Sequence, residues 1–140
     1  MAVTLVSTKL HTPPVRSELV SRPRLLARLD QGLHRKLTLI SAPAGFGKTT
    51  LLGEWTHRLA AGSQPRTRVA WISLDEGDND PARFAAYLAA ALRPEDGPGP
   101  AGGDAPEPAG AWLQESHVGR LVNEVAAQPQ DVVLVLDDYH

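Results

Sequence analysis

The segment 41–50, which reads SAPAGFGKTT, constrains this chain more than any other feature. An apolar run, Leu37–Ile40, precedes it, and apolar residues at helical spacing follow it. Gly45 and Gly47 would let the backbone approach phosphate oxygens, because they carry no Cβ. Successive N–H groups at the start of a helix attract anions. This strand–turn–helix context predicts a phosphate-binding P-loop.

The residue types of the loop suit a nucleoside phosphate. Lys48 supplies a point charge for the β- and γ-phosphates, and the Thr49 hydroxyl is placed to ligate Mg²⁺. The usual motif begins with glycine where this chain has Ala42, a change that costs about 1 kcal/mol or more if φ must be positive. The alternative is a glycine-rich helix start that binds nothing. The nucleotide-binding residues expected from the motif are Ala42, Pro43, Ala44, Gly45, Phe46, Gly47, Lys48, Thr49 and Thr50.

A second apolar run ends in two acids. Residues 132–136 read VVLVL, and Asp137 and Asp138 follow directly. A buried strand ending in aspartate is the expected partner of a P-loop, because that carboxylate holds Mg²⁺. We therefore expect Asp137 to share Mg²⁺ with Thr49. Asp138 is the candidate catalytic residue, an acid that would polarise an attacking water, although its side chain is shorter than the glutamate common at this place.

The whole pattern predicts an α/β fold. Strands are expected at 37–40, 69–74 and 132–136, with helices between them, so the chain should form a partial P-loop NTPase of three α/β/α layers around a parallel sheet of about three strands. Continuous apolar runs agree, because parallel strands are covered on both faces. We expect a leader at 1–22, a partial NTPase domain at 23–140 and, inside it, a flexible Pro/Gly-rich insert at 94–110.

Composition removes several classes of protein. The net charge of −2 excludes a broadly basic nucleic-acid binder, and the absence of cysteine excludes disulfides and thiolate chemistry. The apolar runs are far shorter than a membrane span, and the first residues lack a basic segment typical of a signal peptide. We expect a cytoplasmic chain that neither enters a membrane nor binds DNA directly. The acidic run Asp75–Asp80 fails the EF-hand pattern, so a capped turn with solvated acids is expected there.

Three segments together resemble one family. SAPAGFGKTTLL, WISLDEGDNDPARFAAYLAAAL and LVLDDYH are similar to the N-terminal ATPase domain of MalT-like transcriptional regulators, the large ATP-binding members of the LuxR family within the STAND class of NTPases. The opening TKLHTPPVRSELVSRPRLLARL resembles the family's leader. The resemblance covers nearly the whole chain apart from the Pro/Gly segment, and the Ala-Pro-Ala-Gly start of the loop is the family's usual variant.

The resemblance implies a signal-responsive switch that uses ATP, ADP and Mg²⁺. It also implies slow hydrolysis, self-association of the longer protein, and a remainder with sensor repeats and a helix-turn-helix that these 140 residues do not contain. Around Val20, Ser21 and Arg22 the leader resembles the part of the family that packs near the adenine. Of this chain itself we expect nucleotide binding at most. Two alternatives stay open: a stand-alone P-loop phosphotransferase or kinase, and an inactive truncated product.

Overall fold

The computed structural model describes residues 5–62, 67–94 and 115–139. The helices are α1 (Pro23–Gly32), α2 (Lys48–Ala61), α3 (Pro81–Leu92) and α4 (Glu115–Ala126), the strands are β1 (Arg68–Ser73) and β2 (Val132–Asp137), and two short 3-10 helices, η1 (Ser7–Leu10) and η2 (Glu76–Asn79), accompany them. The mixture of helices with parallel strands is of the α/β type that the sequence predicts. Within the described ranges, no helix is long and apolar enough to cross a membrane.

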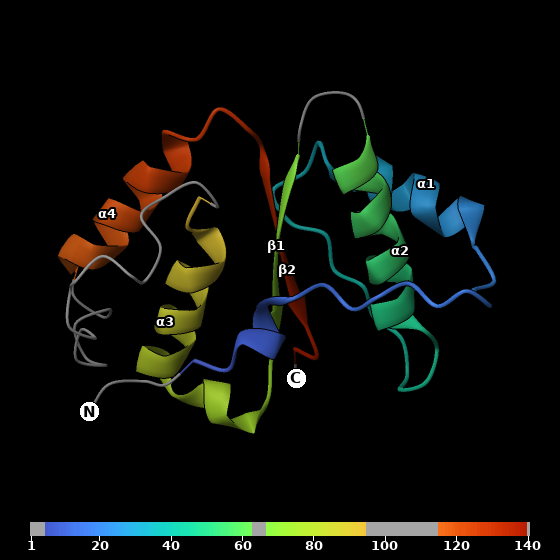
Figure 1. The fold of residues 1–140 in the computed structure, drawn as a ribbon, viewed down its shortest axis with the longest axis horizontal. Coiled ribbons are helices and arrows are strands. Elements are labelled where there is room, and N and C mark those ends of the chain that lie inside the picture. Colours follow the sequence, from blue (N-terminus) through green and yellow to red (C-terminus); the bar gives the residue numbers. More distant parts are fainter. Residues whose placement is uncertain (1–4, 63–66, 95–114, 140) are drawn as a thin grey trace.

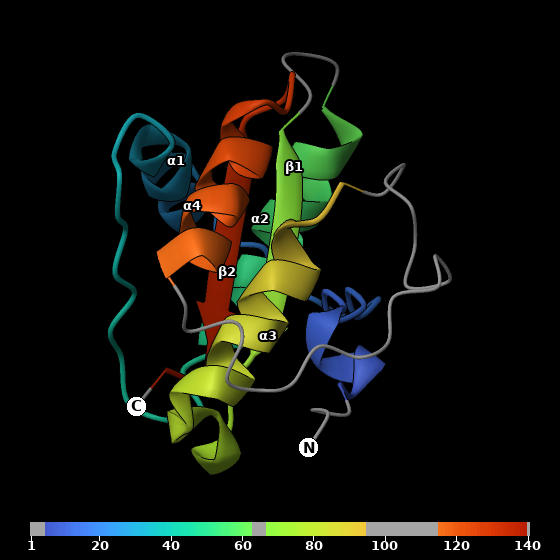
Figure 2. The same cartoon turned by 90° about the vertical axis from the view of Figure 1, so that its left-hand side faces the viewer.

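The two strands form a parallel sheet at the centre of the molecule. Arg68 pairs with Val132 at one end of the register and Ser73 pairs with Asp137 at the other. Figures 1 and 2 show α3 and α4 on one face of the sheet and α1 and α2 on the other. The expected three-layer arrangement is therefore present. Because the strands are parallel and in register, their carboxyl ends meet at one edge.

The expectation of a third strand at 37–40 is wrong in this structure, whose described sheet has two strands. Leu37 and Leu39 are 82% and 81% exposed, and the segment runs past β2 without joining it (Figure 2). Only Ile40 of this run packs inward, against the cluster around Trp55. An apolar run becomes a strand only when a neighbour takes its backbone hydrogen bonds, and the run itself does not encode that partner.

The helix ends follow the local sequence. Pro23 is the first residue of α1, and Pro81 is the first residue of α3, where a missing N–H costs nothing. The Asp80 side chain caps α3 by accepting a hydrogen bond from the Ala82 backbone N–H at 3.1 Å. Helix α2 ends before Gly62. Each of these boundaries depends on a single residue and its own backbone or side-chain groups.

Apolar packing covers both faces of the sheet. One cluster of buried residues joins β1 to α3 and consists of Ala70, Ile72, Tyr87 and Ala91. The other joins α1 to α2 and consists of Leu26, Leu29 and Trp55. The Trp55 indole N–H also donates to the Asp30 carboxylate at 2.8 Å, which ties the two helices together. Burial at this scale is the main stabilising term, at about 25 cal/mol per Å² of apolar surface.

The acidic run after β1 is a capped turn, as expected, but its acids are not all solvated. Asp75 and Asp78 form a reciprocal capping box around η2. The Asp78 side chain is only 3% exposed and forms ion pairs with Lys9 of the leader and, at 3.2 Å, with Arg83 of α3. The Lys9 ammonium also reaches Asp75 at 3.0 Å. The turn therefore holds together segments that are far apart in the sequence.

This contact predicts a pH dependence of stability. Burial opposes the charge of Lys9, but hydrogen bonds to Asp78 and Asp75 outweigh it and raise the pKa of Lys9 above its usual 10.5. The hydrogen bond from Lys9 lowers the pKa of Asp75 below its usual 3.8, against a smaller opposing effect of burial. The stabilisation from Lys9 is thus complete below pH 10.5 and is lost as the pH rises through the folded value. The stabilisation from Asp75 is present above pH 3.8 and is lost as the pH falls through the pKa of Asp75 in the folded protein.

The measurement is the urea midpoint of the wild type and of Lys9→Met across the pH range. We expect the difference between the two proteins to be constant from about pH 5 to about pH 9 and to shrink beyond both limits. A difference that grows as the pH rises above 10.5 would contradict the assignment.

The expected insert at 94–110 lies outside the described residues except for Pro94. The proposed division into a leader at 1–22 and a domain at 23–140 stays a prediction. Residues 5–10 of the leader pack against the core, because Leu5 and Leu10 contact the cluster around Tyr87.

Candidate functional site

The loop 42–47 lies at the edge of the sheet where both strands end. Figure 1 shows it beneath the start of α2, on the same side as the carboxyl end of β2. In open parallel sheets, ligands bind at this edge, outside the carboxyl ends of the strands. One of the expected binding residues, Thr49 in the first turn of α2, contacts Asp137, although 88 positions separate the two.

Two glycines give the loop its shape. Gly45 has a φ of 82° and Gly47 a φ of 80°, and side-chain-bearing residues rarely adopt this left-handed conformation. Among the described residues, Asp138 is the one non-glycine with a positive φ. Ala42 therefore needs no left-handed backbone, and its replacement of the usual glycine carries no strain of that kind.

Lys48 begins α2 and folds back over the loop. Its ammonium donates to the Ala42 carbonyl oxygen at 2.5 Å. This contact joins the end of the loop to its beginning. It also places the positive charge beside the backbone that is predicted to surround a phosphate. The helix adds to the attraction, because the unpaired N–H groups of its first turn carry partial positive charge. Phe46, at the tip of the loop, is 60% exposed.

Thr49 and Asp137 form the contact that joins loop and strand. The Thr49 hydroxyl lies 2.9 Å from each carboxylate oxygen of Asp137. Asp137 is 7% exposed, so this carboxylate is largely withdrawn from water at the end of β2. A hydroxyl beside a carboxylate offers the oxygen ligands that Mg²⁺ prefers, with other positions left for water and phosphate. Thr49 and Asp137, which the sequence predicts to be ligands of Mg²⁺, are therefore adjacent.

Asp138 is placed differently from Asp137. It is exposed, and its φ of 58° shows the chain turning away as the strand ends. Asparagine and aspartate tolerate this conformation better than other side chains. The two consecutive acids therefore face different surroundings, one inside the sheet edge and one in solvent.

The leader also reaches the loop. The Arg22 guanidinium donates to the Phe46 carbonyl oxygen at 3.0 Å, and the Ser21 hydroxyl donates to the Glu54 carboxylate at 2.5 Å. Val20 is 82% exposed. The segment that the resemblance places near the adenine thus lies beside the loop. The partner of Arg22 is a backbone carbonyl, which no local sequence pattern specifies.

Two cavities flank α2. The larger, about 520 Å³, lies at the amino ends of the strands, away from the loop, and is lined by Thr12, Thr56, His57, Ala60, Thr67, Arg68, Val69, Pro94, Gln128, Pro129 and Gln130. The smaller, about 130 Å³, lies between the leader and the first turns of α2, where Thr49 and Thr50 line it. Of these two cavities, the smaller one touches the predicted site.

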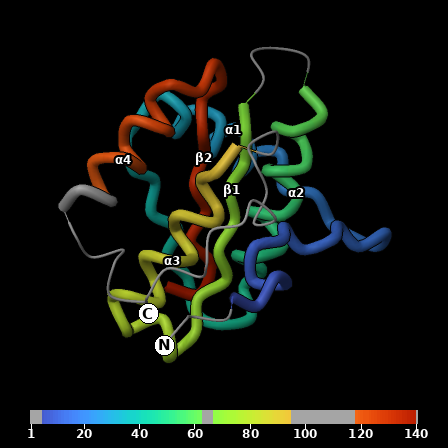
Figure 3. The backbone as a smooth tube through the Cα atoms, turned by 60° about the vertical axis from the view of Figure 1, so that its left-hand side comes forward, coloured from blue at the N-terminus to red at the C-terminus, as the bar shows by residue number. Residues whose placement is uncertain are grey.

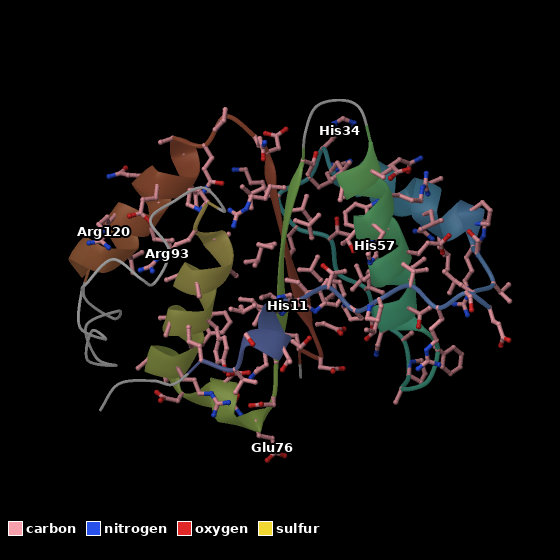
Figure 4. All side chains as sticks on the ribbon, viewed as in Figure 1. His11, His34, His57, Glu76, Arg93 and Arg120 are labelled. Carbon is pink, nitrogen blue, oxygen red and sulfur yellow. The ribbon has the colours of Figure 1, made fainter. Side chains whose placement is uncertain are left out.

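The histidines form no metal site in the described part of the chain. Figure 4 shows His11, His34 and His57 on separate segments. Within residues 5–62, 67–94 and 115–139, no group of three or more histidine or acidic side chains could hold a metal ion, and this includes the acidic turn. His140 lies outside the described residues.

Comparison with known proteins identifies relatives over nearly the whole chain. No protein-family model matches it. It is 42% identical over 137 residues to the HTH-type transcriptional regulator MalT of Cronobacter sakazakii, and 39% identical over 137 residues to the proteins of that name from Klebsiella pneumoniae and Serratia proteamaculans. Each match covers 97% of this chain but 14% of the relative. The chain is therefore homologous, over almost its full length, to a part of MalT-type transcriptional regulators.

Proposed function

We propose that this chain is an ATP-binding part of a signal-responsive transcriptional regulator. The observation that carries the proposal is the contact of the Thr49 hydroxyl with both oxygens of Asp137, directly after a loop shaped by two left-handed glycines. The regulatory role rests on the relatives, which are named as transcriptional regulators and of which the chain spans 14%. Sensing and DNA binding would belong to other parts of such a protein.

The residues present fit a magnesium nucleotide. The loop backbone and the start of α2 would hold the phosphates, and Lys48 would exchange its contact with the Ala42 carbonyl for a phosphate oxygen. Thr49 and Asp137 would hold Mg²⁺, which when bound offsets the charge of the β- and γ-phosphates. Asp138 is the candidate for polarising water, and hydrolysis by these 140 residues is not part of the proposal.

Replacing Asp137 should remove the effect of Mg²⁺. In the wild type we expect Mg²⁺ to strengthen ATP binding about tenfold or more, because Asp137 would help to hold the ion and the ion would offset the charge of the phosphates. In Asp137→Asn, titration calorimetry should give the same affinity with MgCl₂ as with EDTA. The matched control is Asp131→Asn, an exposed acid directly before the first residue of the same strand.

This experiment has a clear contrary outcome. If Asp137→Asn keeps the full effect of Mg²⁺, the Thr49–Asp137 contact is not the metal site. If Asp131→Asn loses it as well, the effect reflects the charge of the chain rather than the site. The proposal requires that only the acid beside Thr49 matters.

A further inference from the structure

The leader is held at both ends. At one end, Lys9 binds the acidic turn through Asp75 and Asp78, and its ammonium lies 4.6 Å from the ring centre of Tyr87. The Tyr87 hydroxyl in turn accepts the Val6 backbone N–H at 3.0 Å. The Lys9 side chain is 11% exposed and that of Asp78 is 3% exposed, so the pair is largely shielded from water and salt.

At the other end, Ser21 and Arg22 hold the leader to the site. Ser21 is bonded to Glu54 of α2, and Arg22 is bonded to the carbonyl of Phe46 in the loop. The leader crosses α2 between these two attachments, as Figures 1 and 3 show. The crossing is close, since a Cβ on the buried Gly53 would lie 3.7 Å from the Pro13 carbonyl oxygen.

The middle of the leader is loosely held. Residues 14–18 are exposed, and the cavity of about 130 Å³ lies beneath this stretch, against Thr49, Thr50 and Gly53. One contact of the middle is between the His57 ring and the Pro13 carbonyl oxygen, at 3.3 Å. Segments with few buried contacts open most readily, so the attachments at the two ends determine whether this stretch stays closed.

We propose that residues 11–20 are a strap over the start of α2, that Lys9 and the acidic turn lock it, and that its opening sets the rate of nucleotide exchange. This inference rests on the proposed nucleotide site, because the strap lines the cavity of about 130 Å³ together with Thr49 and Thr50. The role of the acidic turn is then to hold Lys9 and so to keep the strap closed. Asp78 is buried against a lysine 69 positions away, so the run binds an internal cation rather than a metal ion.

The test measures the strap and the nucleotide separately. In the nucleotide-free chain, Lys9→Met should speed trypsin cleavage after Arg16, an exposed residue of the strap, about tenfold, while amide hydrogen exchange in β1 and β2 stays unchanged. In stopped-flow experiments with a fluorescent ADP analogue, the same variant should release nucleotide about tenfold faster. Lys9→Arg should restore both values, because it keeps the charge.

Two further variants keep the test decisive. Asp75→Asn removes the more exposed partner and should give smaller changes in the same direction, which covers the case in which Lys9→Met fails to fold. Arg120→Met breaks an exposed ion pair on α4, away from the leader, and should change neither value.

The outcomes separate the two proposals. Unchanged trypsin cleavage after Arg16 in Lys9→Met overturns the lock. Faster cleavage after Arg16 with an unchanged rate of nucleotide release overturns the role of the strap in nucleotide exchange. If the wild type binds no nucleotide at all, the proposed function itself fails, and the gating role fails with it.

Discussion

ATP binding by the chain should fall about 30- to 1000-fold when Lys48 is replaced by alanine, a loss of about 2–4 kcal/mol. The ammonium lies against the Ala42 carbonyl, over the loop whose N–H groups would surround a phosphate. Removing it leaves the anion with the partial charges of the helix start and the backbone alone. Titration calorimetry with MgATP measures the effect directly.

The matched control is Lys36→Ala. Lys36 is exposed and lies outside the loop, so its loss removes the same charge from the chain without touching the site. Its affinity for MgATP should stay within about twofold of the wild type, as screening at physiological salt predicts. Equal affinities in the wild type and Lys48→Ala would contradict the site, whatever the control shows.

Replacing Tyr87 by alanine should cost about 3–5 kcal/mol of the free energy of unfolding. Its side chain extends from α3, is fully buried in the cluster with Ala70 and Ile72 of β1, and accepts the Val6 N–H through its hydroxyl. The free energy of unfolding of a small domain is about 5–15 kcal/mol in total, so this variant should be largely unfolded or should unfold at a very low urea concentration. Tyr87→Phe, which removes only the hydroxyl, should cost about 1 kcal/mol.

Tyr139→Ala is the control for that series, because the other tyrosine of the chain is 74% exposed. Its free energy of unfolding, measured by urea denaturation, should change by about 0.5 kcal/mol or less. If Tyr87→Ala were as mild as Tyr139→Ala, the core on this face of the sheet would be packed differently from the arrangement described here.

The sequence predicts those parts of the fold that depend on short-range chemistry. Pro23, Asp80 and Pro81 determine where helices begin, and they do so through their own backbone or side-chain groups. The apolar run before Asp137 is likewise a strand, as its composition indicates. Such features need no knowledge of the rest of the chain.

Features that depend on distant partners are harder to predict. The run 37–40 has the composition of a strand, but a strand also needs a hydrogen-bonded neighbour, and here it has none among the described elements. The acids of the turn look solvated in sequence, and only folding brings Lys9 against Asp78. Arg22 is similar, since its partner is a backbone carbonyl. In the candidate site, by contrast, the motif predicted which residues would meet, and Thr49 does lie beside Asp137.

The most direct test of the account is a residue-resolved titration of the ¹⁵N-labelled chain with MgADP, followed by NMR. We expect the largest shifts at the amides of Gly45, Gly47, Lys48 and Thr49, and smaller ones at Asp137. Shifts confined to the residues around the 520 Å³ cavity at the opposite edge of the sheet, or no shifts at saturating nucleotide, would contradict it.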